Sequence, residues 1–290
     1  MYRKGSDLLK ISEKENWPLW KIALESEIYE NETTEEDVFH KMNEVIKVME
    51  NSSEASLESD NKTLGKIIGG EAKKLNKRIS RGETLCGDTI NEAMKKAFST
   101  SEYNASMGRI CAAPTAGSSG IIPAALLTVK EKYDLDDIEV ARGLLTASAV
   151  GKVISTNATV SGAEGGCQAE CGAAASMAAA AVVEMLGGTP QMSLNAAAIA
   201  LKNIMGLICD PIAGLVESPC SKRNASGVVN ALISAEIALA GIESVIPFDE
   251  VVDTMKKVGD DMHSDYRETA RGGIAGTPTG KKIKENIKNI

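Results

Sequence analysis

GGCQAECGAAASMAAAAVVEML, residues 165–186, decides the fold of this chain, together with LICDPIAGLVESPCSKRN at residues 207–224. An alanine-dense segment that glycine pairs precede and follow is expected to form a helix pressed tightly against other helices, because alanine favours helix and its small side chain permits close approach. Cys167, Cys209 and Cys220 each lie in or beside a turn rather than within the apolar run. The sequence therefore predicts a helical core with three cysteines at its edge.

The composition favours helices over sheets. Hydrophobic residues make up 43% of the 290 residues, but aromatic residues make up only 3%. A sheet core normally uses β-branched and aromatic side chains, whereas small residues suit closely packed helices. No segment alternates between apolar and polar residues strongly enough to predict a strand. We expect an all-α fold, a compact multi-helix domain with buried Ala/Gly-rich helices and an N-terminal helical arm.

The charge balance disfavours some classes of partner. The net charge of -8 argues against binding to nucleic acid or to an anionic membrane, because phosphate groups need a basic face. The longest apolar run contains Glu184 and is a poor membrane span. No apolar segment follows the charged N-terminus, so no signal peptide is predicted. We expect a soluble, cytoplasmic protein, in which six cysteines are more often core, metal or catalytic residues than disulfides.

The chain divides in texture near residue 62. Residues 1–62 are predicted to form a helical arm packed on the main body, with apolar residues at helical spacing over 38–49 and a capping-box pattern at Thr33 and Glu36. Residues 63–290 are predicted to form the main domain. Its expected helices cover residues 64–75 (through Gly69 and Gly70), 93–98, 122 onward, 138–156, 172–186, 193–207 (capped by Ser193), 224–240 and a last one at 249–259.

A polar loop precedes one of these helices. The string GRICAAPTAGSSGIIPAALL, residues 108–127, delivers Thr115, Ser118 and Ser119 just before a helix that begins near Ile122. Backbone N–H groups at a helix start, with hydroxyls beside them, suit a carboxylate or a phosphate. An ordinary capped helix start explains the same residues, and the local sequence leaves both readings open.

The cysteine spacing alone does not identify a metal site. Cys167 and Cys171 can share one helix face, and Cys209 and Cys220 lie at the two ends of a proline-broken loop. Zinc ribbons and ferredoxins instead cluster their cysteines two or three residues apart. The only histidines are His40 and His263, which offer no pair of histidines to complete a zinc set. Spacing therefore leaves a metal site and buried small hydrophobic residues both open.

Longer strings resemble a known family, the alpha chain of bacterial iron–sulfur-dependent L-serine dehydratase (L-serine deaminase). The resemblance covers almost the whole chain, and its motifs are long and specific. They are GRICAAPTAGSSGIIP (108–123), EGGCQAE (164–170), LKNIMGLICDPIAGLVESPCSKRN (201–224) and YRETARGGIAGTPTG (266–280). The resemblance implies a [4Fe–4S] cluster held by the cysteines that match the family's three ligands, Cys167, Cys209 and Cys220, with Cys171 outside the cluster.

The resemblance also implies an activity and a partner. The expected reaction is that of an L-serine ammonia-lyase, a carbon–oxygen lyase that yields pyruvate and ammonia in amino-acid degradation and gluconeogenesis. Three protein ligands on a four-iron cluster leave one iron open to act as a Lewis acid on the serine hydroxyl while a base takes the Cα proton. Single-chain members of the family carry a beta domain that is absent here, so a separate beta chain and a hetero-oligomer are implied.

Other residues are candidates for catalysis. Lys222 and Arg223 directly follow Cys220 and are candidates for binding the substrate carboxylate or tuning the cluster, with a solvated basic turn as the alternative. His263 titrates in the range of a general base, although a histidine in the tail is also consistent with a structural role, and the base can lie on the beta chain.

The candidates for substrate binding are four polar residues, and two residues are also candidates for supporting the cluster. Thr115, Ser118, Ser119 and Asn224 are predicted to contact the substrate. Asp210 and again Asn224 are candidates for contacts behind the cluster ligands.

Three alternatives stay open at this point. A related cluster-dependent deaminase or desulfidase acting on another small amino acid fits the same cysteines. A pyridoxal-phosphate dehydratase would need a Schiff-base lysine and a phosphate loop on an α/β fold, of which GSSG at 117–120 offers only the loop. A redox or electron-transfer protein would need a fourth cysteine ligand, for which Cys171 is the nearby candidate.

Overall fold

The structure is a computed structural model that describes residues 2–60 and 62–287. Within these ranges it contains helices, short helical turns and loops, and its only β pairing is an isolated bridge between Cys209 and Arg267. The expectation of an all-α fold is confirmed. No helix in the described part of the chain is both long and apolar enough to cross a membrane.

The alanine-rich helix α9 (Ala173–Met185) lies at the centre of the fold. Every residue of α9 except Glu184 is buried. It packs against four other helices, which together surround it with small and branched side chains. These are α6 (Ile121–Tyr133), α7 (Asp137–Asn157), α10 (Pro190–Lys202) and α11 (Cys220–Leu239). Alanine permits this arrangement because its side chain is a single methyl group, which lets a neighbouring helix approach closely. The core around α9 is therefore densely packed although α9 itself carries few large side chains.

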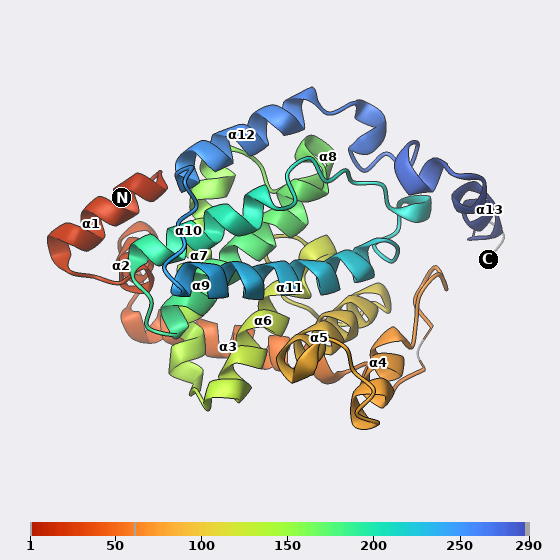
Figure 1. Cartoon of the computed structure of the whole chain (residues 1–290), viewed down its shortest axis with the longest axis horizontal. Coiled ribbons are helices and arrows are strands. Elements are labelled where there is room, and N and C mark those ends of the chain that lie inside the picture. The colour runs from red at the N-terminus through yellow and green to blue at the C-terminus, as the bar shows by residue number, and fades with distance from the viewer. Residues whose placement is uncertain (1, 61, 288–290) are drawn as a thin grey trace.

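Three helices at the N-terminus cover one end of this core. They are α1 (Gly5–Glu15), α2 (Leu19–Asn31) and α3 (Glu35–Glu54) (Figure 1). The side chains of Leu8, Leu19 and Leu24 are buried in the same cluster as the alanines of α9. Glu184 connects the two layers, because its carboxylate accepts hydrogen bonds from the backbone N–H groups of Leu19 at 2.5 Å and Trp20 at 3.1 Å, at the start of α2.

The remaining helices complete the body and form the tail. They are α4 (Glu71–Ser80), α5 (Gly87–Ala105), α8 (Gly162–Gly165), α12 (Phe248–Asp261) and α13 (Pro278–Ile287). The sequence predicted no helix after 249–259, yet α13 forms with Pro278 as its first residue, where the missing N–H of proline costs nothing. In Figure 1 the tail lies at the same end of the molecule as the loop that leads into α11.

The predicted helix over 64–75 is wrong in its first half. Helix α4 begins only at Glu71, because Gly69 and Gly70 have φ angles of 139° and 78° that end any preceding helix. Residues 63–68 are instead a turn-rich segment.

Two predicted helix caps are also displaced. Thr34 rather than Thr33 caps α3, since its hydroxyl accepts from the N–H of Asp37 at 3.2 Å. Thr189 rather than Ser193 caps α10, where Pro190 fixes the first helical residue. In both cases the threonine that directly precedes the helix, rather than the predicted residue, accepts a hydrogen bond from an N–H group of the first turn.

Candidate functional site

Four cysteines gather where α9 and α11 begin. Cys167 precedes a π-helical turn over Gln168–Gly172, which places the sulfur of Cys171 3.4 Å from that of Cys167. Cys209 follows α10, and Cys220 is the first residue of α11. The first three are buried and Cys220 is half-buried.

The three predicted ligands act on one another electrostatically. Burial raises the pKa of Cys220 to about 12, and the neighbouring Cys167 adds to this effect. Burial also raises the pKa of Cys209, with smaller contributions from Glu170, Cys167 and Cys220. The hydrogen bond with Cys171 lowers the pKa of Cys167, helped by the charge of Arg223. The thiols of Cys167, Cys209 and Cys220 therefore influence one another's pKa, but among the described residues no group of three or more His, Cys, Asp or Glu side chains could hold a metal ion.

The side chain of Arg223 lies at this centre, whereas that of Lys222 lies away from it. Arg223 donates from Nη2 to Oδ1 of Asp210 at 2.7 Å and from Nη1 to the carbonyl of Ile208 at 2.9 Å. Asp210 is only 1% exposed, so this is a buried ion pair rather than a solvated turn. Lys222 is 52% exposed and pairs with Glu71 at 2.8 Å on another face. Because α11 begins at Cys220, successive residues of its first turn point about 100° apart.

The polar loop before α6 contacts the centre through one side chain. Thr115 donates to Oε1 of Glu170 at 2.7 Å, and the hydroxyl of Ser118 lies 3.2 Å from that of Thr115. Ser119 is buried and turns back to the carbonyl of Ala116 at 2.9 Å.

Asn224 fixes the shape of this loop. Its Oδ1 accepts from the N–H of Gly120 at 2.8 Å, and its Nδ2 donates to the carbonyl of Gly117 at 2.7 Å. The same Nδ2 lies 2.9 Å from the carbonyl of Cys220, so Asn224 ties the loop to the helix that carries a cysteine. Its amide is thus occupied by the protein, and its evident role is to hold the loop.

Glu170 lies at the centre of the site and was missed in the sequence. Its Oε2 lies 3.6 Å from the sulfur of Cys209, and burial raises its pKa. A Cβ added to Gly162 would approach Oε2 to 2.6 Å and the Cys209 sulfur to 3.1 Å, so glycine leaves the space that the carboxylate occupies. The signal available in the sequence was an acidic residue three positions after Cys167 in an otherwise small and apolar segment.

The C-terminal tail lies against Cys209. The N–H of Cys209 donates to the carbonyl of Tyr266, and the N–H of Glu268 donates to the carbonyl of Cys209, each at 2.8 Å. Farther along, the N–H of Ile274 donates to Oδ2 of Asp210 at 2.7 Å. The tail motif therefore packs on the cysteine centre of this same chain.

His263 is not part of this arrangement. Its side chain is 69% exposed, and its contacts are with Asp265 and Tyr266 inside the tail. The structure thus places the predicted base candidate at the surface.

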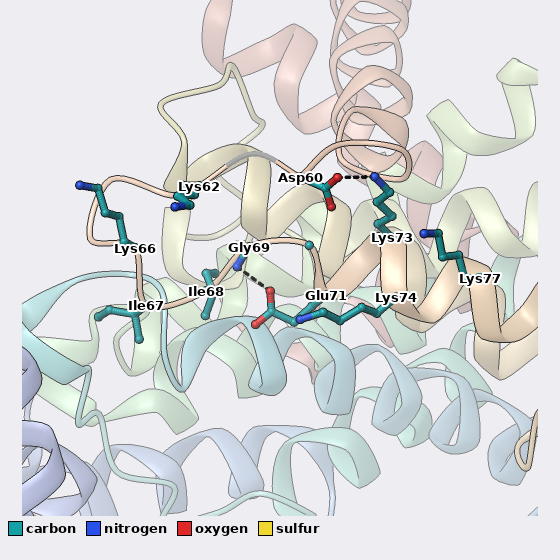
Figure 2. Close-up of a pocket in the computed structure, with 11 residues that line it drawn as sticks. Asp60, Lys62, Lys66, Ile67, Ile68, Gly69, Glu71, Lys73, Lys74 and Lys77 are labelled. Carbon is teal, nitrogen blue, oxygen red and sulfur yellow. Dashed lines mark hydrogen bonds and ion pairs between the residues drawn. The ribbon is translucent and has the colours of Figure 1, made fainter.

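A separate pocket of about 600 Å³ lies beside α4 (Figure 2). Five lysines line it with Asp60 and Glu71, and Lys73 pairs with Asp60 at 2.5 Å. None of the predicted site residues lines this pocket. One of its walls is the segment Ile67, Ile68 and Gly69, which Figure 2 shows leading into Glu71.

The fold and this site define a class: an all-helical protein with a buried multi-cysteine centre flanked by an arginine–aspartate pair and a polar loop. Residues 14–275 match the family model described as serine dehydratase alpha chain, and the chain belongs to this family. The chain is 50% identical over 287 residues to "L-serine dehydratase, alpha chain" of Peptoniphilus asaccharolyticus, which covers 99% of this chain and 98% of that relative. The resemblance seen in the sequence motifs is confirmed.

Longer relatives match this chain over part of their own length. "L-serine dehydratase 2" of Escherichia coli (strain K12) is 36% identical over 281 residues, 94% of this chain but 61% of that protein. "L-serine dehydratase" of Streptomyces coelicolor is likewise 36% identical over 282 residues, 94% of this chain and 60% of that protein. These relatives therefore contain a further region that this chain does not match.

Proposed function

We propose that this chain is the catalytic alpha chain of an L-serine dehydratase, converting L-serine to pyruvate and ammonia. The observation that carries the proposal is the near-complete match, at 50% identity, to a relative named as such an alpha chain. The cysteine centre supports it, because a cluster-dependent dehydratase would need cysteine thiols as ligands of its cluster.

The proposed cofactor is a [4Fe–4S] cluster on Cys167, Cys209 and Cys220. Thiolates are the usual ligands of such clusters, and coordination removes the proton that burial otherwise holds on Cys209 and Cys220. The charge of Arg223 beside Cys167 would offset the added negative charge. Ser221, next to Cys220, has a buried hydroxyl without a hydrogen-bond partner among the described residues, and a group bound beside it would supply one. These features support the proposal, and cluster binding would draw the three thiols together, because no three such side chains among the described residues form a metal-binding group in this structure.

The residues around the centre support a division of roles. A cluster iron without a protein ligand would supply Lewis-acid assistance to loss of the serine hydroxyl. Both donor arms of Arg223 are already occupied by Asp210 and Ile208, so we assign it a fixed positive charge beside the cysteines rather than a free carboxylate clamp. Thr115 and Ser118 remain the candidates for substrate contact, while Ser119 and Asn224 hold their loop.

The remaining assignments are less direct. Lys222, paired with Glu71 away from the cysteines, would act outside the reacting centre. The base that removes the Cα proton is assigned to the partner chain or to His263 brought in on assembly. The further region of the longer relatives supports a separate beta chain and a hetero-oligomeric enzyme.

The test is to express this chain with its beta chain, purify both without oxygen, and measure pyruvate formed from L-serine. Pyruvate formation that depends on bound iron and not on added pyridoxal phosphate supports the proposal. L-cysteine as substrate, with sulfide as the readout, tests the desulfidase alternative. Activity that requires pyridoxal phosphate, or an assembled complex inactive on L-serine, would rule the proposal out.

A further inference from the structure

Glu217 is a buried carboxylate that the chemistry described above does not use. It is 2% exposed and lies three residues before Cys220. Its Oε1 accepts from the N–H of Gly65 at 2.5 Å. Its Oε2 accepts from the hydroxyl of Thr63 at 2.6 Å and from the N–H groups of Ile67 and Ile68 at 2.9 and 3.3 Å. All these donors belong to the segment 63–68.

Three of the backbone N–H groups in the segment 63–68 depend on this carboxylate, while those of Leu64 and Lys66 donate to the carbonyls of Ala105 and Thr63. In the described structure, the N–H groups of Gly65, Ile67 and Ile68 donate to no acceptor other than Glu217. Unsatisfied buried N–H groups are costly, and a carboxylate that accepts several of them forms strong, charge-assisted bonds. Lys66, Ile67 and Ile68 of this segment also line the pocket of Figure 2.

The backbone of Glu217 is equally fixed on the side of the cysteine centre. Its carbonyl accepts from the N–H of Ser221 at 3.0 Å, in the first turn of α11. Its own N–H donates to the carbonyl of Leu215 at 2.8 Å. The residue therefore joins the segment 63–68, through its side chain, to the helix turn that carries Cys220, through its backbone.

Gly65 makes the contact possible. A Cβ at this position would lie 2.8 Å from Oε1 of Glu217 and would also overlap the side chain of Leu215. Only glycine lets the carboxylate approach the backbone this closely. The contact between Glu217 and Gly65 can consequently be disturbed by a substitution at either residue. A change at Glu217 can alter the charge, whereas a change at Gly65 does not.

We infer that Glu217 is a positioning residue, which holds the first turn of α11 against the segment 63–68 and thereby keeps Cys220 at the cysteine centre. The functional meaning of this role rests on the proposed function, in which Cys220 is a cluster ligand. A change at Glu217 or Gly65 is expected to loosen Cys220 while the helical core stays folded.

Two variants test the contact, and a third is a matched control. Glu217→Gln keeps the shape but turns one acceptor into an N–H donor that faces other donors. Gly65→Ala displaces the carboxylate without changing any charge. Glu184→Gln alters a half-buried carboxylate that also accepts backbone N–H groups, but it lies 13 residues after Cys171, about 20 Å away at 1.5 Å per residue.

The first readout needs no cluster. Cluster-free protein is treated with a thiol-alkylating reagent, and mass spectrometry follows modification of Cys220 with Cys171 as the internal reference. Losing a hydrogen bond to a charged group corresponds to roughly a tenfold rise in local opening, so both test variants should modify Cys220 roughly tenfold faster. Circular dichroism establishes that each variant is folded. Glu217→Asp, which keeps the charge, should restore part of the protection.

The second readout is the cluster itself, as iron and sulfide bound per chain after anaerobic reconstitution. Both test variants should lose the cluster faster than the wild type, and Glu184→Gln should not. Unchanged reactivity of Cys220 in both test variants, or an equal change in Glu184→Gln, overturns the inference. A wild-type chain that takes up no iron refutes the proposed cofactor instead, and the alkylation result still decides the role of Glu217.

Discussion

Replacement of Gly273 by alanine should release the C-terminal tail from the cysteine centre. Gly273 has a φ angle of 57°, and a Cβ there would overlap the carboxylate of Asp210. The same carboxylate accepts the N–H of Ile274 at 2.7 Å, so the methyl group and this hydrogen bond cannot both be accommodated.

The expected cost has two parts. Placing alanine in the left-handed region costs about 1 kcal/mol, and losing a hydrogen bond to a charged acceptor costs about 2 kcal/mol. A total of about 3 kcal/mol corresponds to roughly a hundredfold rise in the open population of the tail. Because the tail docks on the outside of the helical core, the urea midpoint of the whole chain should change far less than this local equilibrium.

Hydrogen exchange followed by mass spectrometry measures the effect on peptides covering residues 262–276. Gly241→Ala is the control, since Gly241 has a φ of 82° and no atom within 4 Å of an added Cβ. It should lower global stability slightly and leave exchange in the tail unaltered. Tail exchange in Gly273→Ala that equals the wild type would refute the reasoning, because it would mean that Asp210 does not hold the tail.

Three further predictions follow from buried and half-buried groups. Burial raises the pKa of Glu184 above its ordinary value of 4.5, so the folded state keeps this proton to higher pH, and its contribution to stability is present at low pH and lost as pH rises through the raised pKa. Urea denaturation across pH should therefore show a decline in the wild type that Glu184→Gln lacks; parallel curves would contradict this. Arg223→Met should destabilise the chain by about 3 to 5 kcal/mol by leaving Asp210 buried and unpaired, and adding Asp210→Asn should recover part of the loss; a double variant no better than the single one would exclude a buried ion pair. Cys171→Ser should keep the reconstituted cluster, whereas Cys167→Ser should lose it; loss in Cys171→Ser alone would overturn the ligand assignment.

The helical core could be predicted from the sequence. The alanine run, the glycine pair that ends it, and the aspartates before α7 follow local rules, and the structure agrees with them. The segment with Gly69 and Gly70 was predicted wrongly, because its apolar spacing suggested one helix while the backbone has positive φ angles at both glycines. Local periodicity does not report a constraint that another part of the chain imposes.

The site was only partly predictable for the same reason. Arg223 and Lys222 are neighbours in sequence, and only the start of α11 at Cys220 decides that the first is half-buried and the second exposed. Glu170 and Glu217 acquire their roles from Thr115 and from the segment 63–68, which are distant in sequence. No local pattern marks a carboxylate whose partners lie in another part of the chain.

The most direct test of the central claim is Mössbauer spectroscopy of the iron-57-reconstituted complex with the beta chain, recorded with and without L-serine. A [4Fe–4S] cluster on Cys167, Cys209 and Cys220 predicts that L-serine changes the signal of a single iron, the one without a protein ligand. A spectrum that L-serine leaves unchanged, or a catalytically active complex without bound iron, would contradict the account.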